Sequence, residues 1–161
     1  MIKIAKNTAK DATELHNLYL TSFWEADNIL EDPNDNYSIL DEKYTIKHID
    51  VYLKAKDGSQ IIGFLKITRG KFTKNNHSAN LEIYILPEFR KMGVATKLLK
   101  AGLKKAKILK IKRIELEVWS NNTPAIRLYK KLGFKTEGKK NNAYRVKNKY
   151  VDSILMYKWL K

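Results

Sequence analysis

The chain has 161 residues, of which 43% are hydrophobic and 11% aromatic, a composition that suits one folded domain and excludes a disordered tail. It contains no cysteine, which excludes disulfides, a cysteine nucleophile and thiolate metal sites, and its three histidines show no metal-ligand spacing, so no metal is expected. The formal net charge of +15 favours an anionic partner, while no apolar run reaches the roughly eighteen residues of a membrane span.

Hydrophobic periodicity predicts strands and helices along most of the chain. Near the N-terminus, Thr8 and Asp11 resemble a capping box that precedes a helix ending near Trp24. The pair Asp57 and Gly58 is a strong signal for the turn of a β-hairpin. The predicted strands cover residues 2–6, 49–55, 60–68, 79–86, 111–119, 134–139 and 150–159. The predicted helices cover residues 12–24, 38–47, 94–109 and 123–132, and a basic connection starts at Lys140.

This order of elements predicts a single α/β domain over residues 1–161. Two of the connections between strands contain a helix, which is how parallel strands are joined, whereas the hairpin joins antiparallel ones. We therefore expect a mixed, mostly antiparallel, twisted sheet of about seven strands flanked by about four helices. No internal repeat, low-complexity segment or linker divides the chain.

The segment after the predicted strand 79–86 has the pattern of an anion-binding loop. It contains Arg90-x-x-Gly93-x-Ala95 and is followed at once by an amphipathic helix. The backbone N–H groups of such a loop, with the N-terminal end of the helix dipole, bind phosphates, and the small residues Gly93 and Ala95 let the backbone approach closely. Arg90 and Lys91 add positive charge. The alternative is an ordinary glycine turn, and the lack of a G-x-G-x-x-G pattern disfavours a dinucleotide.

A second group of polar residues follows the predicted helix 94–109. Glu117 lies on a predicted strand, Asn122 at the entry to the next helix and Tyr129 on that helix. A carboxylate, an amide and a phenol can thus face one ligand. Each residue also has a structural interpretation, in which Asn122 is a helix N-cap, Tyr129 packs against the sheet and Glu117 lies on a solvated strand face.

Together the two segments resemble the motifs of the GNAT superfamily of acetyl-CoA-dependent N-acyltransferases, from about Ala79 to the C-terminus. The second segment is similar to that of the ribosomal-protein alanine acetyltransferases, with the pattern Glu117-Val-x-x-x-Asn122-x-x-Ala125-Ile-x-Leu-Tyr129-x-x-Leu-Gly-Phe134. The C-terminal end is similar to that of amino-acid and phosphinothricin-type acetyltransferases, with the pattern Tyr150-x-Asp152-x-x-x-Met156.

The resemblance implies the superfamily fold and acetyl-CoA as the acetyl donor. It also implies a base on the strand, Glu117, and an acid on the helix, Tyr129. The cofactor contacts that it implies are Ile83, Tyr84, Ile85, Arg90, Lys91, Met92, Gly93, Val94, Ala95, Thr96, Asn122 and Ala125.

The chemistry implied by the resemblance is direct transfer through a ternary complex. A strand N–H at residues 83–85 polarises the thioester carbonyl, Glu117 takes the ammonium proton and Tyr129 protonates the leaving thiolate. Glu82 and solvent remain alternatives as the base. Glu82 ranks second because its side chain points to the face opposite to that of Leu81.

The expected acceptor is a small primary amine, such as an amino acid, a polyamine or an aminoglycoside-like molecule, in the cytoplasm. A polycationic acceptor is repelled by the net charge of +15, unless the acidic stretch 25–35 forms its entrance. The alternatives are a protein N-terminus or ribosomal protein as acceptor, a non-catalytic acyl-CoA-binding relative, and a basic RNA-associated protein. Because the lysines are spread along the chain without interleaved aromatic residues, nucleic acid is not expected as a partner, and a homodimer is left open.

Overall fold

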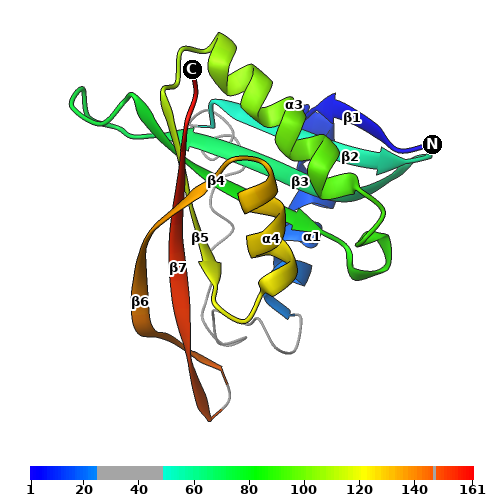
Figure 1. Cartoon of the computed structure of the whole chain (residues 1–161). Helices are drawn as coiled ribbons and strands as arrows, with labels where there is room; N and C mark the ends of the chain where they lie inside the picture. The colour runs from blue at the N-terminus through cyan, green and yellow to red at the C-terminus, as the bar shows by residue number, and fades with distance from the viewer. Residues whose placement is uncertain (25–48, 147) are drawn as a thin grey trace.

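The computed structural model describes residues 1–24, 49–146 and 148–161, which form a seven-stranded sheet with helices on both faces (Figure 1). In the order of the sheet, the strands are β1 (Lys3–Lys6), β2 (Val51–Asp57), β3 (Gln60–Arg69), β4 (Ser78–Ile85), β5 (Arg113–Trp119), β7 (Lys149–Trp159) and β6 (Lys135–Val146). The helices in the described residues are α1 (Ala12–Trp24), α3 (Val94–Ile108), α4 (Thr123–Lys131) and the 3₁₀ helices η1 (Ala9–Asp11) and η2 (Pro87–Phe89). Neighbouring strands are antiparallel except β4 and β5, which are parallel.

These elements confirm the predicted α/β fold with a mixed sheet of seven strands. The helix predicted at residues 38–47 lies outside the described residues. The connection predicted from Lys140 is wrong, because residues 140–146 continue β6 and pair with β7. The register of this pair shifts at two places, so the side chains of β6 show no regular alternation in the sequence. Its lysines suit a strand at the edge of the sheet, because charge there opposes pairing with another chain.

Two apolar layers hold the helices to the sheet. α3 and α4 lie in front of the sheet in Figure 1, and α1 lies behind it. The larger layer joins the sheet to α3 and α4 and includes Leu65, Ile67, Leu98, Leu99 and Tyr129. The smaller layer joins α1 to β3 and consists of Leu15, Leu18, Ile61 and Phe64.

The start of α1 is tied to the sheet by a buried ion pair between Asp11 and Lys54. The Asp11 carboxylate also accepts hydrogen bonds from the N–H group (2.8 Å) and the hydroxyl (2.6 Å) of Thr8. Burial alone would raise the pKa of Asp11. The hydrogen bonds from Lys54 and Thr8 outweigh burial and lower the pKa to about 2.

We expect Asp11→Asn to lower the free energy of unfolding at neutral pH by about 3 kcal/mol, because it leaves the Lys54 ammonium buried without a counter-charge. Since the pKa of Asp11 is lower in the folded state, its stabilisation is present above the unfolded pKa of about 4 and is lost as the pH falls toward the folded value. Urea unfolding of wild type and variant should therefore converge in acid.

The control for this prediction is Asp57→Asn. Asp57 also forms an ion pair, but its partner is the exposed terminal amine of Met1. We expect this variant to lose less than about 1 kcal/mol of unfolding free energy. Equal losses in the two variants would contradict the role given to Asp11.

The strands β4 and β5 part after three residue pairs. Those pairs lie at the N-terminal ends of the two strands and are Ser78 with Arg113, Ala79 with Ile114 and Asn80 with Glu115. Each strand stays paired along its outer edge, β4 with β3 as far as Ile85 and β5 with β7 as far as Trp119. The sheet therefore opens between β4 and β5 toward their C-terminal ends.

Candidate functional site

Every second backbone N–H group of β4 points into this opening. At the end of the strand, the N–H group of Leu86 donates a hydrogen bond to the Ile62 carbonyl of β3 (3.0 Å). Because backbone groups alternate in direction along a strand, those of Ile83 and Ile85 face away from β3 and toward the opening. There the Ile85 carbonyl accepts a hydrogen bond from Nε of Arg90 (3.0 Å).

The loop between η2 and α3 brings further N–H groups together. Lys91 (φ 62°) and Gly93 (φ 77°) adopt the left-handed backbone conformation. The N–H group of Lys97 bonds to the Gly93 carbonyl (3.1 Å), and the N–H groups of the first turn before it have no partner within the helix. A Cβ atom added to Gly93 would meet no atom within 4 Å, so the space above this glycine is open. This geometry suits an anion.

The side chains predicted to contact a cofactor around this loop differ in their placement. The Arg90 guanidinium lies 5.6 Å from the ring centroid of Tyr84, so it turns back over β4. The side chains of Lys91 and Met92 are exposed, whereas that of Val94 is buried in the larger apolar layer. Ala95 and Thr96 are half-buried on the first turn of α3. Their contacts with a ligand stay predictions.

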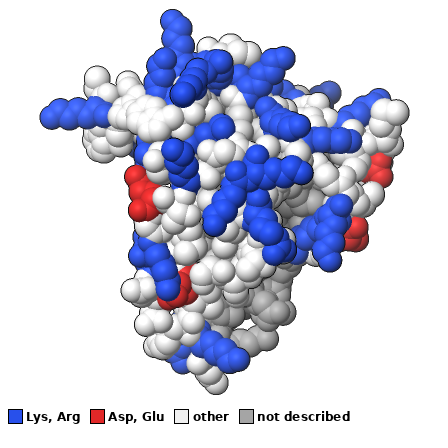
Figure 2. Space-filling view, viewed as in Figure 1, with Lys and Arg blue, Asp and Glu red and all other residues white. Residues whose placement is uncertain are grey.

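The face that carries α3 and α4 is strongly basic (Figure 2). α3 has no acidic residue and contains Lys97, Lys100, Lys104, Lys105 and Lys107. Several cations on the other face of the sheet are instead paired with carboxylates, namely Lys54, Lys66, Arg113 and Lys140. The helix that begins at the open loop therefore carries positive charge that no acidic residue of its own balances, and this charge attracts anionic ligands.

Glu117 lies on β5, and three side chains hold its carboxylate. Oε1 accepts hydrogen bonds from the hydroxyls of Ser153 (2.5 Å) and Tyr144 (2.9 Å), and Oε2 is paired with Nζ of Lys140 at 2.7 Å. Burial raises the pKa of Glu117, but these three partners outweigh it and keep the pKa below its ordinary value. Burial and the hydrogen bond to Glu117 raise the pKa of Tyr144 to about 12. At neutral pH the carboxylate is therefore ionised and the phenol protonated.

A bulge in β6 directs Lys140 and Tyr144 toward the same carboxylate. Between these two residues β6 advances four positions while β7 advances two. Within the bulge, Asn142 (φ 51°) donates its N–H group to Oδ1 of Asp152 (2.8 Å). The sequence analysis missed Lys140, Tyr144 and Ser153, since it placed Lys140 in a connection and no local pattern relates it to Glu117.

Tyr129 belongs to α4, and its side chain lies between this helix and the other face of the sheet. Its ring packs edge-on against Phe134 with centroids 5.7 Å apart, and burial raises the pKa of its phenol to about 12. Leu116 and Val118 of β5 belong to the same apolar layer as Tyr129. Because side chains alternate along a strand, Glu117 points to the opposite face. The two predicted catalytic side chains thus lie on opposite faces of the sheet.

Asn122 caps α4. Its Oδ1 accepts a hydrogen bond from the N–H group of Ala125 (3.2 Å), as the structural interpretation of this residue predicts. In this cap the side-chain amide of Asn122 keeps both of its N–H donors for a ligand. The contacts predicted here are those of Asn122 and Ala125 with a cofactor. They stay predictions.

Glu82, the alternative base, shares the face of Glu117. Asn80 and Glu115 are register partners, so their side chains lie on one face, and Glu82 and Glu117 each follow two positions later. Side-chain direction, which ranked Glu82 second, therefore does not separate the two carboxylates. Glu82 is paired with Lys66 at 2.8 Å.

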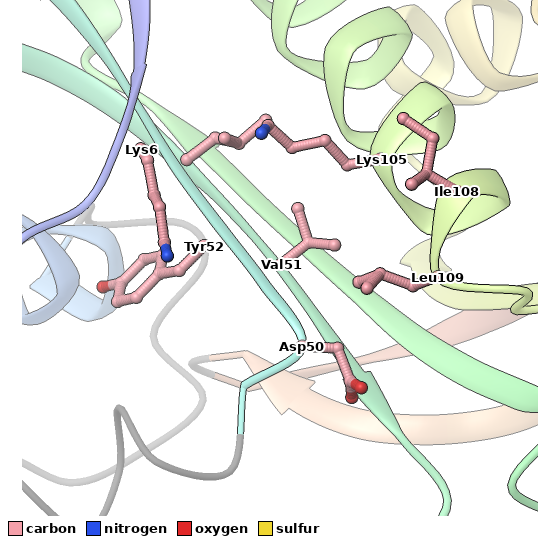
Figure 3. A pocket seen from close by; sticks show the side chains of 8 residues that line it. Lys6, Asp50, Val51, Tyr52, Lys105, Ile108 and Leu109 are labelled. Carbon is pink, nitrogen blue, oxygen red and sulfur yellow. The ribbon is translucent and has the colours of Figure 1, made fainter.

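A cavity of about 230 Å³ lies away from these residues, between β2 and the C-terminal turn of α3 (Figure 3). It is lined by Lys6, Asp50, Val51, Tyr52, Leu53, Lys105, Ile108 and Leu109, none of which is a predicted site residue. Across the described ranges, no group of three or more His, Asp and Glu side chains is placed to hold a metal ion. No helix in the described part of the chain is long and apolar enough to cross a membrane.

The chain is similar to known acetyltransferases. Residues 11–134 match the model of the Acetyltransferase (GNAT) family. The chain is 30% identical to the L-amino acid N-acetyltransferase AaaT of Escherichia coli K12 over 131 residues, which are 80% of each chain. It is 28% identical to the spermidine N(1)-acetyltransferase of Vibrio cholerae over 157 residues, 91% of this chain and 86% of that one. Its fold matches a GNAT superfamily phosphinothricin acetyltransferase of Sinorhizobium meliloti in complex with AcCoA, with a TM-score of 0.84, 18% identity and coverage of 99% and 88% of the two chains.

Proposed function

The chain belongs to the acetyltransferase (GNAT) family, which its sequence motifs resemble, and on this premise we propose that it transfers an acetyl group from acetyl-CoA to the primary amine of a small molecule. The observation that carries the proposal is the opening between β4 and β5. An anion-binding loop follows β4, Glu117 lies on one face of the sheet and Tyr129 on the other. This arrangement supports direct transfer in a ternary complex.

The residues at the opening fit acetyl-CoA. The free N–H groups at the start of α3 and the open space above Gly93 suit a pyrophosphate. The N–H groups of Ile83 and Ile85 face the opening, where they suit a carbonyl oxygen, and Asn122 and Ala125 complete the proposed set at the start of α4. When bound, acetyl-CoA supplies an acyl group activated as a thioester.

In the proposed reaction, two side chains of the protein accept and donate protons. The amine nitrogen forms a bond to the thioester carbonyl carbon, and the bond from that carbon to sulfur breaks. Glu117, directly or through a water molecule, accepts the first proton that the ammonium loses, before attack, and Tyr129 donates its phenol proton to the departing sulfur. The second proton that the nitrogen loses, once it is acylated, passes through water to solvent. The N–H group of Ile83 stabilises the negative charge that develops on the carbonyl oxygen. Exchange with solvent restores both side chains.

The test is release of free thiol from acetyl-CoA in the presence of a panel of primary amines, with mass spectrometry of the products. We expect release that depends on the amine, together with a product heavier by one acetyl group. Binding of acetyl-CoA without release by any amine or peptide would identify a non-catalytic relative. Release with N-terminal peptides of ribosomal proteins alone would contradict a small-molecule acceptor.

We expect acetyl-CoA to raise the melting temperature of the wild type, and Gly93→Val to abolish this rise. Valine would place a branched side chain in the open space above the loop and is strained at φ 77°. Gly58→Val is the matched control, because Gly58 also has a positive φ (58°) with no atom within 4 Å, but lies in the turn between β2 and β3. Both variants should melt lower than the wild type. If Gly93→Val keeps its full response to acetyl-CoA, the loop does not belong to the binding site.

A further inference from the structure

The two oxygens of the Glu117 carboxylate have different partners. Oε1 is fixed by the hydroxyls of Ser153 and Tyr144, which come from two different strands. Oε2 is held only by Lys140 among the described residues, at 2.7 Å, and the Lys140 side chain is 53% exposed. Lys140 can therefore move away from Oε2 while Glu117 stays in position.

We infer that Lys140 binds the carboxylate of the acceptor, and that the acceptors of this site are α-amino acids. This inference rests on the proposed function and names the substrate class of the same site. The ammonium of the amino acid takes the place of Lys140 at Oε2 of Glu117, and the carboxylate of the amino acid pairs with the Lys140 ammonium. The reacting amine is then the group beside the proposed base.

Charge balance supports this exchange. The pair of Glu117 and Lys140 is neutral in the free protein. An α-amino acid carries an ammonium and a carboxylate on the same carbon, so its entry converts one ion pair into two adjacent pairs and leaves no charge without a partner. Pairing of this kind offsets the loss of solvation that each charged group undergoes in a partly buried site.

A polyamine cannot form the second ion pair, with Lys140, because it has no carboxylate. It carries only positive charges, so it either binds beside the Lys140 ammonium or displaces Lys140 from Glu117 without offering it a new carboxylate. Both outcomes bring like charges together on the face where Glu82 is already paired with Lys66. Lys140 therefore selects against polyamines as well as for amino acids.

Lys139 provides a matched control. It precedes Lys140 on β6, its side chain is 51% exposed, and it is also paired with a carboxylate at 2.7 Å, that of Asp152. Because successive side chains on a strand point to opposite faces, Lys139 points away from the face of Glu117. The two lysines are thus alike in residue type, exposure and ion pairing, but their side chains lie on opposite faces of the sheet.

The experiment measures kcat/KM by thiol release for L-amino acids, for their primary amides, which keep the amine and lack the carboxylate, and for spermidine. The enzymes are the wild type, Lys140→Gln and Lys139→Gln. We expect the wild type to prefer each accepted amino acid over its amide by roughly tenfold to a hundredfold, as for a hydrogen bond to a charged group, and to use spermidine poorly. Lys140→Gln should abolish this preference, and Lys139→Gln should keep it.

The ratio of acid to amide isolates the contact made by Lys140. Loss of Lys140 also changes the environment of Glu117, but that change affects acid and amide alike and cancels in the ratio. Equal use of acids and amides by the wild type, efficient use of spermidine, or the same ratio in both lysine variants would overturn this inference while leaving acetyl transfer to amines in place. Absence of thiol release with every amine would overturn the proposed function, and this inference with it.

Discussion

Replacing Tyr129 with phenylalanine is expected to lower kcat by roughly 10²-fold, within the range of acid–base contributions, with little change in affinity for acetyl-CoA. The substitution removes only the phenol oxygen, so the ring keeps its packing against Phe134 and within the larger apolar layer. Without the phenol, the sulfur has to depart without a proton from the enzyme. Steady-state thiol release measures kcat, and calorimetric titration measures the affinity.

The control is Tyr150→Phe, which removes the hydroxyl of an exposed tyrosine on β7 and should leave kcat unchanged. The raised pKa of Tyr129, about 12, means that its proton is present throughout the range from about pH 6 to 9. The loss in Tyr129→Phe should therefore be the same at every pH in that range. A wild-type rate in this variant would show that solvent, or another group, protonates the sulfur.

The second large effect is expected for Glu117→Gln, which should lower kcat/KM for the acceptor by roughly 10²-fold. Glutamine has nearly the same size and can still accept hydrogen bonds from Ser153 and Tyr144. It cannot take a proton from the ammonium, and it gives Lys140 no counter-charge. The melting temperature and the affinity for acetyl-CoA, measured in parallel, should show that the fold and the cofactor site are intact.

The pH dependence of kcat/KM gives a second test of the role of Glu117. The pKa of Glu117 is held below its ordinary value, so the activity that needs its ionised form is present above that pKa and is lost as the pH falls through it. In the wild type this acid limb of kcat/KM should lie below the usual carboxylate pKa of about 4.3, and Glu117→Gln should lack it. A decline that both enzymes show between about pH 9 and 7 belongs to protonation of the acceptor amine.

Two further glutamine variants identify the base. Glu115→Gln is the matched control, since Glu115 lies on the same strand and face and is held by Ser78 (2.6 Å) and Arg113 (2.6 Å), and it should keep the wild-type rate. Glu82→Gln tests the alternative carboxylate. A larger loss in Glu82→Gln than in Glu117→Gln would assign the base to Glu82. Near-normal rates in both would assign it to solvent.

Features that depend on neighbouring residues could be predicted from the sequence. The hairpin at Gly58 and the turn into α3 at Gly93 both contain a residue with positive φ, which glycine adopts without strain. Alternating apolar residues placed β4 and β5, and Asn122 indicated the start of α4. The position of the loop that we propose binds the pyrophosphate followed from these local signals alone.

The surroundings of Glu117 could not be predicted, because they depend on strand register. Lys140, Tyr144 and Ser153 lie 23, 27 and 36 residues away from Glu117 along the chain. A bulge in β6 decides that both Lys140 and Tyr144 reach Glu117, and a shift of register by one residue would turn either side chain to the other face. The direction of the Arg90 side chain was not predicted either, although its contact is close in sequence: Nε of Arg90 donates a hydrogen bond to the carbonyl of Ile85, five residues earlier.

The position of β6 in the sheet lets the β6–β7 hairpin change in evolution while the rest of the sheet is kept. β6 is the outermost strand of the sheet, and substitutions at exposed positions on it have small effects on stability. Residues 139–145 can therefore vary, and the bulge can gain or lose residues, while β3, β4 and α3 keep the packing that holds the loop proposed to bind acetyl-CoA. With the site as proposed here, descendants of one ancestral enzyme can diverge in acceptor by changes in this hairpin and still inherit the same acetyl-CoA site.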